Sequence, residues 1–222
     1  MGTQLSLKAS DGVTIGAYRA DPAGKPRGAL VVCQEIFGVN QHIRSVCDRY
    51  AASGYVALAP AFFDRVEPNL ELGYTPDDIA RGRSIMQHVK LDNAMLDVKA
   101  AVALLSSVGK IGIVGYCWGG TVAWASATRV DGLACSAPYY GGGIAGLAAE
   151  KPRCPVEMHF GETDHAIPMT DVDKVRAAQP GVAFFVYPAG HGFNCDERGS
   201  FDAASAKLAT ERTLAQLARH VG

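Results

Sequence analysis

Short apolar runs that alternate with amphipathic segments constrain the fold of this chain most strongly. The runs are nearly continuous and cover residues 29–33, 55–59, 111–114, 156–160 and 182–187. Runs of this length are typical of strands buried on both faces of a sheet. Between them, apolar residues recur every three or four positions over 43–52, 76–89, 94–108, 121–128, 172–178 and 203–220, which predicts helices. The alternation predicts an α/β fold with a mostly parallel, doubly wound sheet, helices on both faces, and a site beyond the carboxyl ends of the strands.

The N-terminal segment follows a different pattern. Residues 4–9 and 13–20 alternate polar and apolar side chains around the turn at 10–12, which predicts an antiparallel β-hairpin. No repeat or linker divides the 222 residues, and this length lies within the range that one hydrophobic core supports. We therefore expect a single domain over residues 1–222.

Composition narrows the classes of partner. Lys and Arg number 21 against 22 Asp and Glu, so no field of one sign attracts nucleic acid or an anionic membrane. No stretch approaches the roughly 20 apolar residues that span a bilayer, and the N-terminus does not resemble a secretory signal. The six cysteines form no C-x-x-C pair, and we expect them to be reduced. These features favour a cytoplasmic protein, a monomer or weak homodimer, that binds a small molecule.

The sharpest local motif is Gly-Tyr-Cys-Trp-Gly-Gly at 115–120, directly after the apolar run 111–114 and before a helical segment. This pattern predicts a nucleophile elbow, a tight strand-to-helix turn in which neighbours two residues away must be glycine. Gly115 and Gly119 meet that requirement around Cys117. The turn would place the sulfur at a helix N-terminus, where the helix dipole favours the thiolate. On the motif alone, a structural cysteine at a βα turn is an equal alternative.

Two later residues complete a catalytic set. Asp164 and His191 each follow a predicted strand, and the order of nucleophile, acid and base is that of an α/β-hydrolase. A histidine in such a loop can take the thiol proton, and an aspartate can fix its tautomer. Weaker alternatives are Asp171 and Asp173 for the acid and His159 and His165 for the base, whereas His42, His88 and His220 are interpreted as helix-surface residues.

The chain resembles the dienelactone hydrolases (carboxymethylenebutenolidases) over nearly its whole length. The resemblance rests on Gln-Glu-Ile-Phe-Gly-Val-Asn at 34–40, the motif 115–120, Asp164, Gly190-His191 and Glu-Arg-Thr-Leu at 211–214. It implies that Glu35 holds the cysteine proton at rest, until substrate displaces that contact. It also implies that the backbone N–H groups of Ile36 and Trp118 form the oxyanion hole.

Substrate recognition is less well matched. Family members that cleave dienelactone bind its carboxylate with two arginines, and the first family position falls nearest Gly82, between Arg81 and Arg83. The second falls nearest Cys195, with Arg198 three residues later. We expect substrate contacts from Arg81, Arg83, Phe37 and Tyr139. Surface arginines with no role in substrate binding are an equal alternative.

The resulting hypothesis is a carboxylic-ester hydrolase that cleaves a small ester or lactone through a thioester on Cys117, with no metal or organic cofactor. One alternative is a carboxylesterase of broad range. Another is a non-catalytic thiol sensor, in which Cys195 would resolve an oxidised Cys117. A metal site is a weaker alternative, built from His159, Asp164, His165 and His191.

Overall fold

An eight-stranded sheet forms the centre of the computed structural model, which describes residues 2–222. The strands are β1 Thr3–Lys8, β2 Thr14–Ala20, β3 Gly28–Cys33, β4 Tyr55–Pro60, β5 Ile111–Tyr116, β6 Leu133–Tyr139, β7 Glu157–Gly161 and β8 Ala183–Tyr187. The α-helices are α1 Gln41–Ala52, α2 Pro76–Met86, α3 Leu91–Leu105, α4 Trp118–Arg129, α5 Met169–Ala178 and α6 Ala203–His220. Two short 3-10 helices, η1 Phe62–Arg65 and η2 Ile144–Leu147, lie in the connections.

The strand order is β1-β2-β4-β3-β5-β6-β7-β8. Strands β3 to β8 pair in parallel, whereas β1 and β2 form the antiparallel hairpin and β2 joins β4 antiparallel. This arrangement confirms the predicted fold class. Strand β6 was not predicted, because Ser136 and Pro138 interrupt its apolar pattern, although both side chains are buried in the structure.

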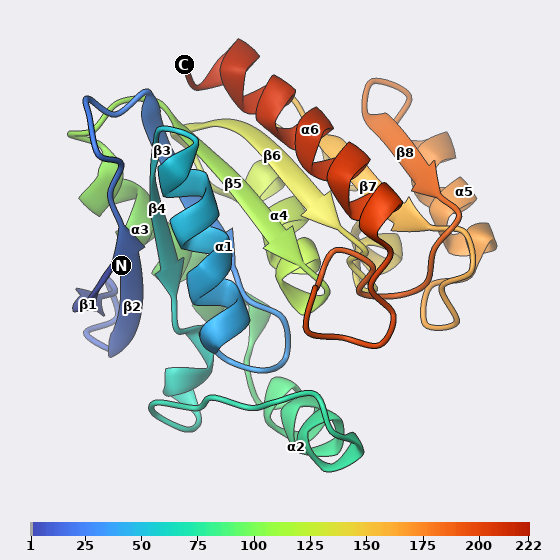
Figure 1. The fold of residues 1–222 in the computed structure, drawn as a ribbon, viewed down its shortest axis with the longest axis horizontal. Coiled ribbons are helices and arrows are strands. Elements are labelled where there is room, and N and C mark those ends of the chain that lie inside the picture. The colour runs from blue at the N-terminus through green and yellow to red at the C-terminus, as the bar shows by residue number, and fades with distance from the viewer. Residues whose placement is uncertain (1) are drawn as a thin grey trace.

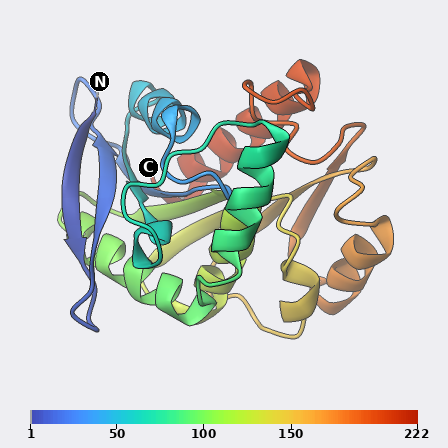
Figure 2. The same ribbon diagram turned by 90° about the horizontal axis from the view of Figure 1, so that it is seen from below.

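Helices cover both faces of the sheet, as Figure 2 shows: α1 and α6 lie on one face, and α3, α4 and α5 on the other. Every residue of β3, β4 and β5 is buried, which explains their unbroken apolar runs. Helix α2 stands apart from both layers, at the end of the sheet toward which β3 and β4 point (Figure 1). Within residues 2–222, no helix is at once long enough and apolar enough to span a membrane.

Candidate active site

Cys117 occupies the sharp turn between β5 and α4. Its φ of 57° and ψ of −118° place a non-glycine residue in a strained region of backbone space. A Cβ atom at residue 115 would lie 1.9 Å from the carbonyl oxygen of Gly119, and one at residue 119 would lie 2.4 Å from the carbonyl oxygens of Cys33 and Gln34. Only glycine fits at either position, because residue 115 packs against the next turn of the elbow and residue 119 packs against the end of β3. The strained turn predicted from the sequence is therefore present.

The predicted acid and base meet at this turn. Asp164 follows β7 and His191 follows β8, and parallel neighbouring strands deliver both side chains to one edge of the sheet. His191 Nδ1 lies 2.7 Å from Asp164 Oδ2, and His191 Nε2 lies 3.1 Å from Cys117 Sγ. Because a carboxylate can only accept, Nδ1 carries a hydrogen and Nε2 faces the sulfur. The three side chains form one continuous hydrogen-bonded chain.

The surroundings of Asp164 hold it in place. Its second oxygen, Oδ1, accepts backbone N–H bonds from Ala166 at 2.8 Å and Ile167 at 3.1 Å, and its side chain is 1% exposed. Burial disfavours the charged form of His191, but the hydrogen bonds to Asp164 and Cys117 outweigh it and raise the pKa of His191 to about 10. An imidazole in this setting is a strong enough base to retain the proton of a thiol.

Glu35 follows β3 and is buried beside the elbow. Arg198 Nη1 donates to Glu35 Oε1 at 2.9 Å, and Oε2 of the same carboxylate has no hydrogen-bond partner within residues 2–222. The sulfur of Cys117 bonds His191 instead of Glu35. A guanidinium forms a stronger, charge-assisted bond to a carboxylate than a thiol does, which explains the partner that Glu35 has in this structure.

The two amides expected to form an oxyanion hole are available. None of the hydrogen bonds within residues 2–222 uses the backbone N–H of Ile36 or Trp118 as donor. Both residues line the same cavity as Cys117. Two free N–H groups beside a nucleophile can stabilise an oxygen that becomes negative.

The cavity in front of Cys117 has a volume of about 420 Å³. Most of its lining is apolar, and Arg83 and Arg198 supply its cationic groups. Its full lining is Ile36, Phe37, Ile79, Arg83, Met86, Leu91, Cys117, Trp118, Thr121, Gly142, Gly143, Ala166, Ile167, His191 and Arg198. This size and lining suit a small, largely apolar molecule that carries one anionic group.

Two of the four residues predicted to contact substrate line the cavity. Phe37 and Arg83 line the cavity, whereas Arg81 is exposed and forms an ion pair with Glu67 outside it. Position 82, where the resemblance expected an arginine, is closed to any side chain because a Cβ there would lie 2.4 Å from the carbonyl oxygen of Ile36. The predicted contact by Arg81 is therefore wrong for this structure.

Tyr139 also departs from its prediction. The side chain is fully buried, its hydroxyl lies 2.6 Å from the hydroxyl of Thr213, and it does not line the cavity. The neighbouring Tyr140 packs its ring edge-on against His191, with ring centroids 5.2 Å apart. Sequence reasoning missed Tyr140 because it missed β6, whose end determines which tyrosine faces the site.

The metal quartet proposed from the sequence is not assembled. His159 is buried beneath aromatic rings, with Nδ1 2.8 Å from the hydroxyl of Tyr187, and burial lowers its pKa to about 3. In the part of the chain that the structure describes, one other group has ligand atoms close enough for a metal: Glu35, His42 and Cys195. His42 was expected on a helix surface, which is wrong, because its side chain is 1% exposed.

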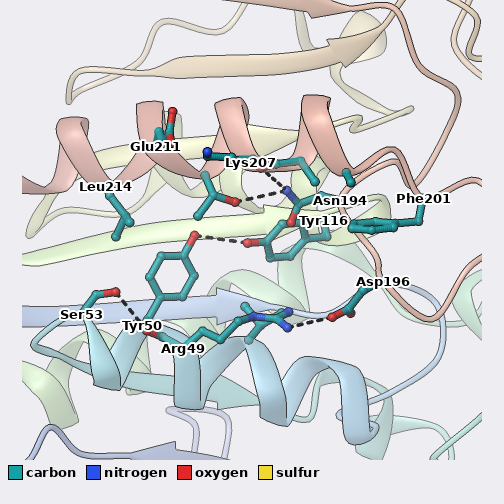
Figure 3. Close-up of a pocket in the computed structure, with 14 residues that line it drawn as sticks. Arg49, Tyr50, Ser53, Tyr116, Asn194, Asp196, Phe201, Lys207, Glu211 and Leu214 are labelled. Atoms are coloured by element: carbon teal, nitrogen blue, oxygen red, sulfur yellow. Dashed lines mark hydrogen bonds and ion pairs between the residues drawn. The ribbon is translucent and has the colours of Figure 1, made fainter.

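A second cavity, of about 360 Å³, lies on the opposite face between α1 and α6 (Figure 3). The hydroxyls of Tyr50 and Tyr116 meet in it at 3.2 Å, and Arg49 pairs with Asp196 at its side. None of the triad residues lines it. The cavity in front of Cys117 is therefore the candidate active site.

The fold, with a strained elbow at Cys117 after β5 that is hydrogen-bonded in series to His191 after β8 and Asp164 after β7, defines the class of this protein as an α/β-hydrolase. Comparison with known proteins narrows the class further. The family model described as "Dienelactone hydrolase family" matches residues 15–221, so the chain belongs to the dienelactone hydrolase family and is a hydrolase of carboxylic esters.

Individual relatives agree with this assignment. A protein of Synechocystis sp. named "Putative carboxymethylenebutenolidase" is 33% identical over 231 residues, which cover 95% of this chain and 94% of the relative. A protein of the same name from Azospirillum brasilense is 34% identical, with 99% of this chain and 100% of the relative covered. The crystal structure titled "Putative Dienelactone Hydrolase" from Klebsiella pneumoniae has a TM-score of 0.87 at 28% identity and covers 99% of this chain and 100% of that one.

Proposed function

We propose that this enzyme hydrolyses a small, carboxylate-bearing ester or lactone through a thioester on Cys117. The observation that carries the proposal is the continuous bonding of Asp164, His191 and Cys117, at 2.7 Å and 3.1 Å, with Cys117 and His191 on the wall of one cavity. A strained elbow, two free amides and a base with a raised pKa are the components that acyl transfer to a thiol requires.

The reaction follows from these positions. Nε2 of His191 takes the proton of the thiol, and the sulfur attacks the carbonyl carbon while the N–H groups of Ile36 and Trp118 stabilise the oxyanion. The carbon–oxygen bond to the leaving group breaks, and the imidazolium returns its proton to that oxygen. The product of this half-reaction is a thioester and a free alcohol or enol.

Hydrolysis of the thioester uses the same base. Once the sulfur is acylated it no longer raises the pKa of His191 as the free sulfur did, so the imidazole is neutral more readily. It removes a proton from water as the water attacks the thioester carbon. The carbon–sulfur bond then breaks and the imidazolium returns its proton to the sulfur. This step regenerates the thiol of Cys117 and releases a carboxylic acid.

Arg83 supports the preference for an anionic substrate. It lines the cavity and forms no ion pair within residues 2–222, whereas Arg198 is engaged by Glu35. A substrate carboxylate can pair with Arg83 directly. If it also draws Arg198 away, Glu35 loses its partner and becomes free to contact Cys117, whereas the resemblance places that contact in the resting enzyme.

The test compares aryl-ester turnover in the wild-type enzyme, Cys117→Ala and the control Cys154→Ala, which removes a partly buried thiol next to β7. We expect a loss of at least about 10³-fold for Cys117→Ala, near-normal turnover for the control, and a transient acyl adduct on Cys117 by mass spectrometry. Undiminished turnover in Cys117→Ala would refute the proposal.

A carboxylesterase of broad range is the second candidate, because the cavity is mostly apolar. Matched ester substrates with and without a carboxylate distinguish the two. If Arg83→Gln raises KM at least tenfold for the anionic ester and leaves the neutral ester unchanged, the narrower function holds. Equal kcat/KM for both esters in the wild type favours the broader one.

A further inference from the structure

A cluster of three metal-ligating side chains lies behind Arg198: Glu35, His42 and Cys195. They come from the loop after β3, the first turn of α1 and the loop after β8. All three are buried, and one carboxylate oxygen, one ring nitrogen and the sulfur lie within 4.8 Å of one another. Carboxylate, imidazole and thiol together form a ligand set that zinc accepts.

The cluster has unused binding capacity. Oε2 of Glu35 is buried and has no hydrogen-bond partner within residues 2–222. Buried polar atoms are nearly always paired, because an unpaired one costs free energy. Oε2 of Glu35 therefore retains an acceptor position for a further partner.

The support around His42 has the form found at metal sites. Its Nδ1 lies 2.9 Å from Oδ1 of Asp196, whose other oxygen accepts from Arg49 at 3.0 Å. A histidine that binds a metal through one ring nitrogen commonly donates from the other to a carboxylate, which orients the ring. Nε2 of His42 has no hydrogen-bond partner in residues 2–222, so His42 retains one nitrogen for a ligand.

The cluster is reached from the catalytic cavity. Arg198 lines that cavity and donates to Oε1 of Glu35, so this side chain links the cavity with the cluster. Arg198 can stay on Oε1 while a cation occupies Oε2. Glu35, the Cys195 thiolate and Asp196 supply three negative charges, against four positive charges on a divalent cation, Arg198 and Arg49.

We propose that Glu35, His42 and Cys195 bind a divalent, zinc-like cation. On binding, the Cys195 thiol releases its proton to solvent, three protein ligand bonds form, and a water molecule takes the fourth position. Nothing is oxidised or reduced. Metal binding depends only on the cluster and does not rest on the proposed function.

The binding test uses Co²⁺ as a coloured substitute for zinc and a Cys117→Ala enzyme, in which the catalytic thiol cannot compete. We expect a thiolate-to-cobalt absorption band that Zn²⁺ abolishes, that persists in the control with the added change Cys154→Ser, and that is lost on adding Cys195→Ser. Asp196→Asn should weaken cobalt binding by about 10- to 100-fold. If excess Co²⁺ gives no such band in the folded Cys117→Ala enzyme, the proposal is overturned, whatever happens to the other variants.

Discussion

Replacing Asp164 with Asn tests the central geometry, because the substitution changes one atom of the triad. The backbone N–H groups of Ala166 and Ile167 bond Oδ1, and only the amide oxygen of Asn can accept from them. The amide nitrogen must therefore take the place of Oδ2, 2.7 Å from His191 Nδ1. There it donates instead of accepting, so the imidazole flips to the tautomer with its hydrogen on Nε2, and this hydrogen faces the sulfur.

The magnitude follows from the pKa of His191. Its rise from 6.5 to about 10 corresponds to stabilisation of the imidazolium on the order of 5 kcal/mol, and the hydrogen bond to Asp164 is the largest single stabilising contribution. Losing this contribution should lower kcat/KM by up to about 10³-fold, or about 4 kcal/mol. The loss should be smaller than the roughly 10⁴-fold effect in serine triads, because a thiol ionises more easily than a hydroxyl.

The assay is aryl-ester kinetics combined with an NMR titration of His191. Asp164→Asn should lower both kcat/KM and the pKa of His191, and should leave the far-ultraviolet circular dichroism unchanged. The matched control is Asp173→Asn, which removes a surface carboxylate paired with Arg176 and should alter neither. If Asp164→Asn retains activity within tenfold, or the control loses as much, the triad assignment is incorrect.

Three further outcomes are expected. Gly119→Ala should destabilise the fold by at least about 2 kcal/mol in urea and reduce ester turnover, because its Cβ would meet two backbone carbonyls at 2.4 Å. Gly146→Ala, whose Cβ would meet nothing within 4 Å, should do neither. The contribution of His191 to stability should be fully present below pH 6.5 and be lost as the pH rises through about 10, because folding raises its pKa. The measurement is the difference in unfolding free energy between the wild type and His191→Gln. If this difference stays constant over this pH range, the predicted contribution of His191 is refuted. Arg65→Ala leaves the buried carboxylate of Asp97 unpaired and should cost about 3–5 kcal/mol in urea, whereas a loss below 1 kcal/mol would mean that the pair is unimportant.

The contact between Glu35 and Arg198 shows where sequence reasoning ends. Glu35 was identified from its motif, but its partner lies 163 residues away in a loop with no periodic pattern. Gly192, with φ of 78°, leaves the space that Arg198 occupies, since a Cβ there would lie 2.5 Å from its Nη1. The path of this loop depends on contacts with α1 that no local pattern encodes.

The aromatic neighbours of the site also depend on contacts that the sequence does not predict. Tyr139 and Tyr140 are adjacent, and a shift of one residue at the end of β6 decides which ring meets His191. His42 has helical spacing that suggests a surface position, yet Asp196 and the loop after β8 cover it. Both errors concern the packing of one segment on another.

By itself, the sequence determined the fold class and the hairpin, and it predicted the three side chains that meet at the candidate site. Each of these follows from local periodicity or from a turn that only glycine allows, and such signals lie within a few neighbouring residues. Only the tertiary structure decided which arginines reach the cavity, which tyrosine contacts His191, and which side chains surround Glu35. Those pairings depend on the approach of loops that are distant in the chain. Contacts of this kind require no periodic pattern in the sequence of either segment, so the sequence does not reveal them.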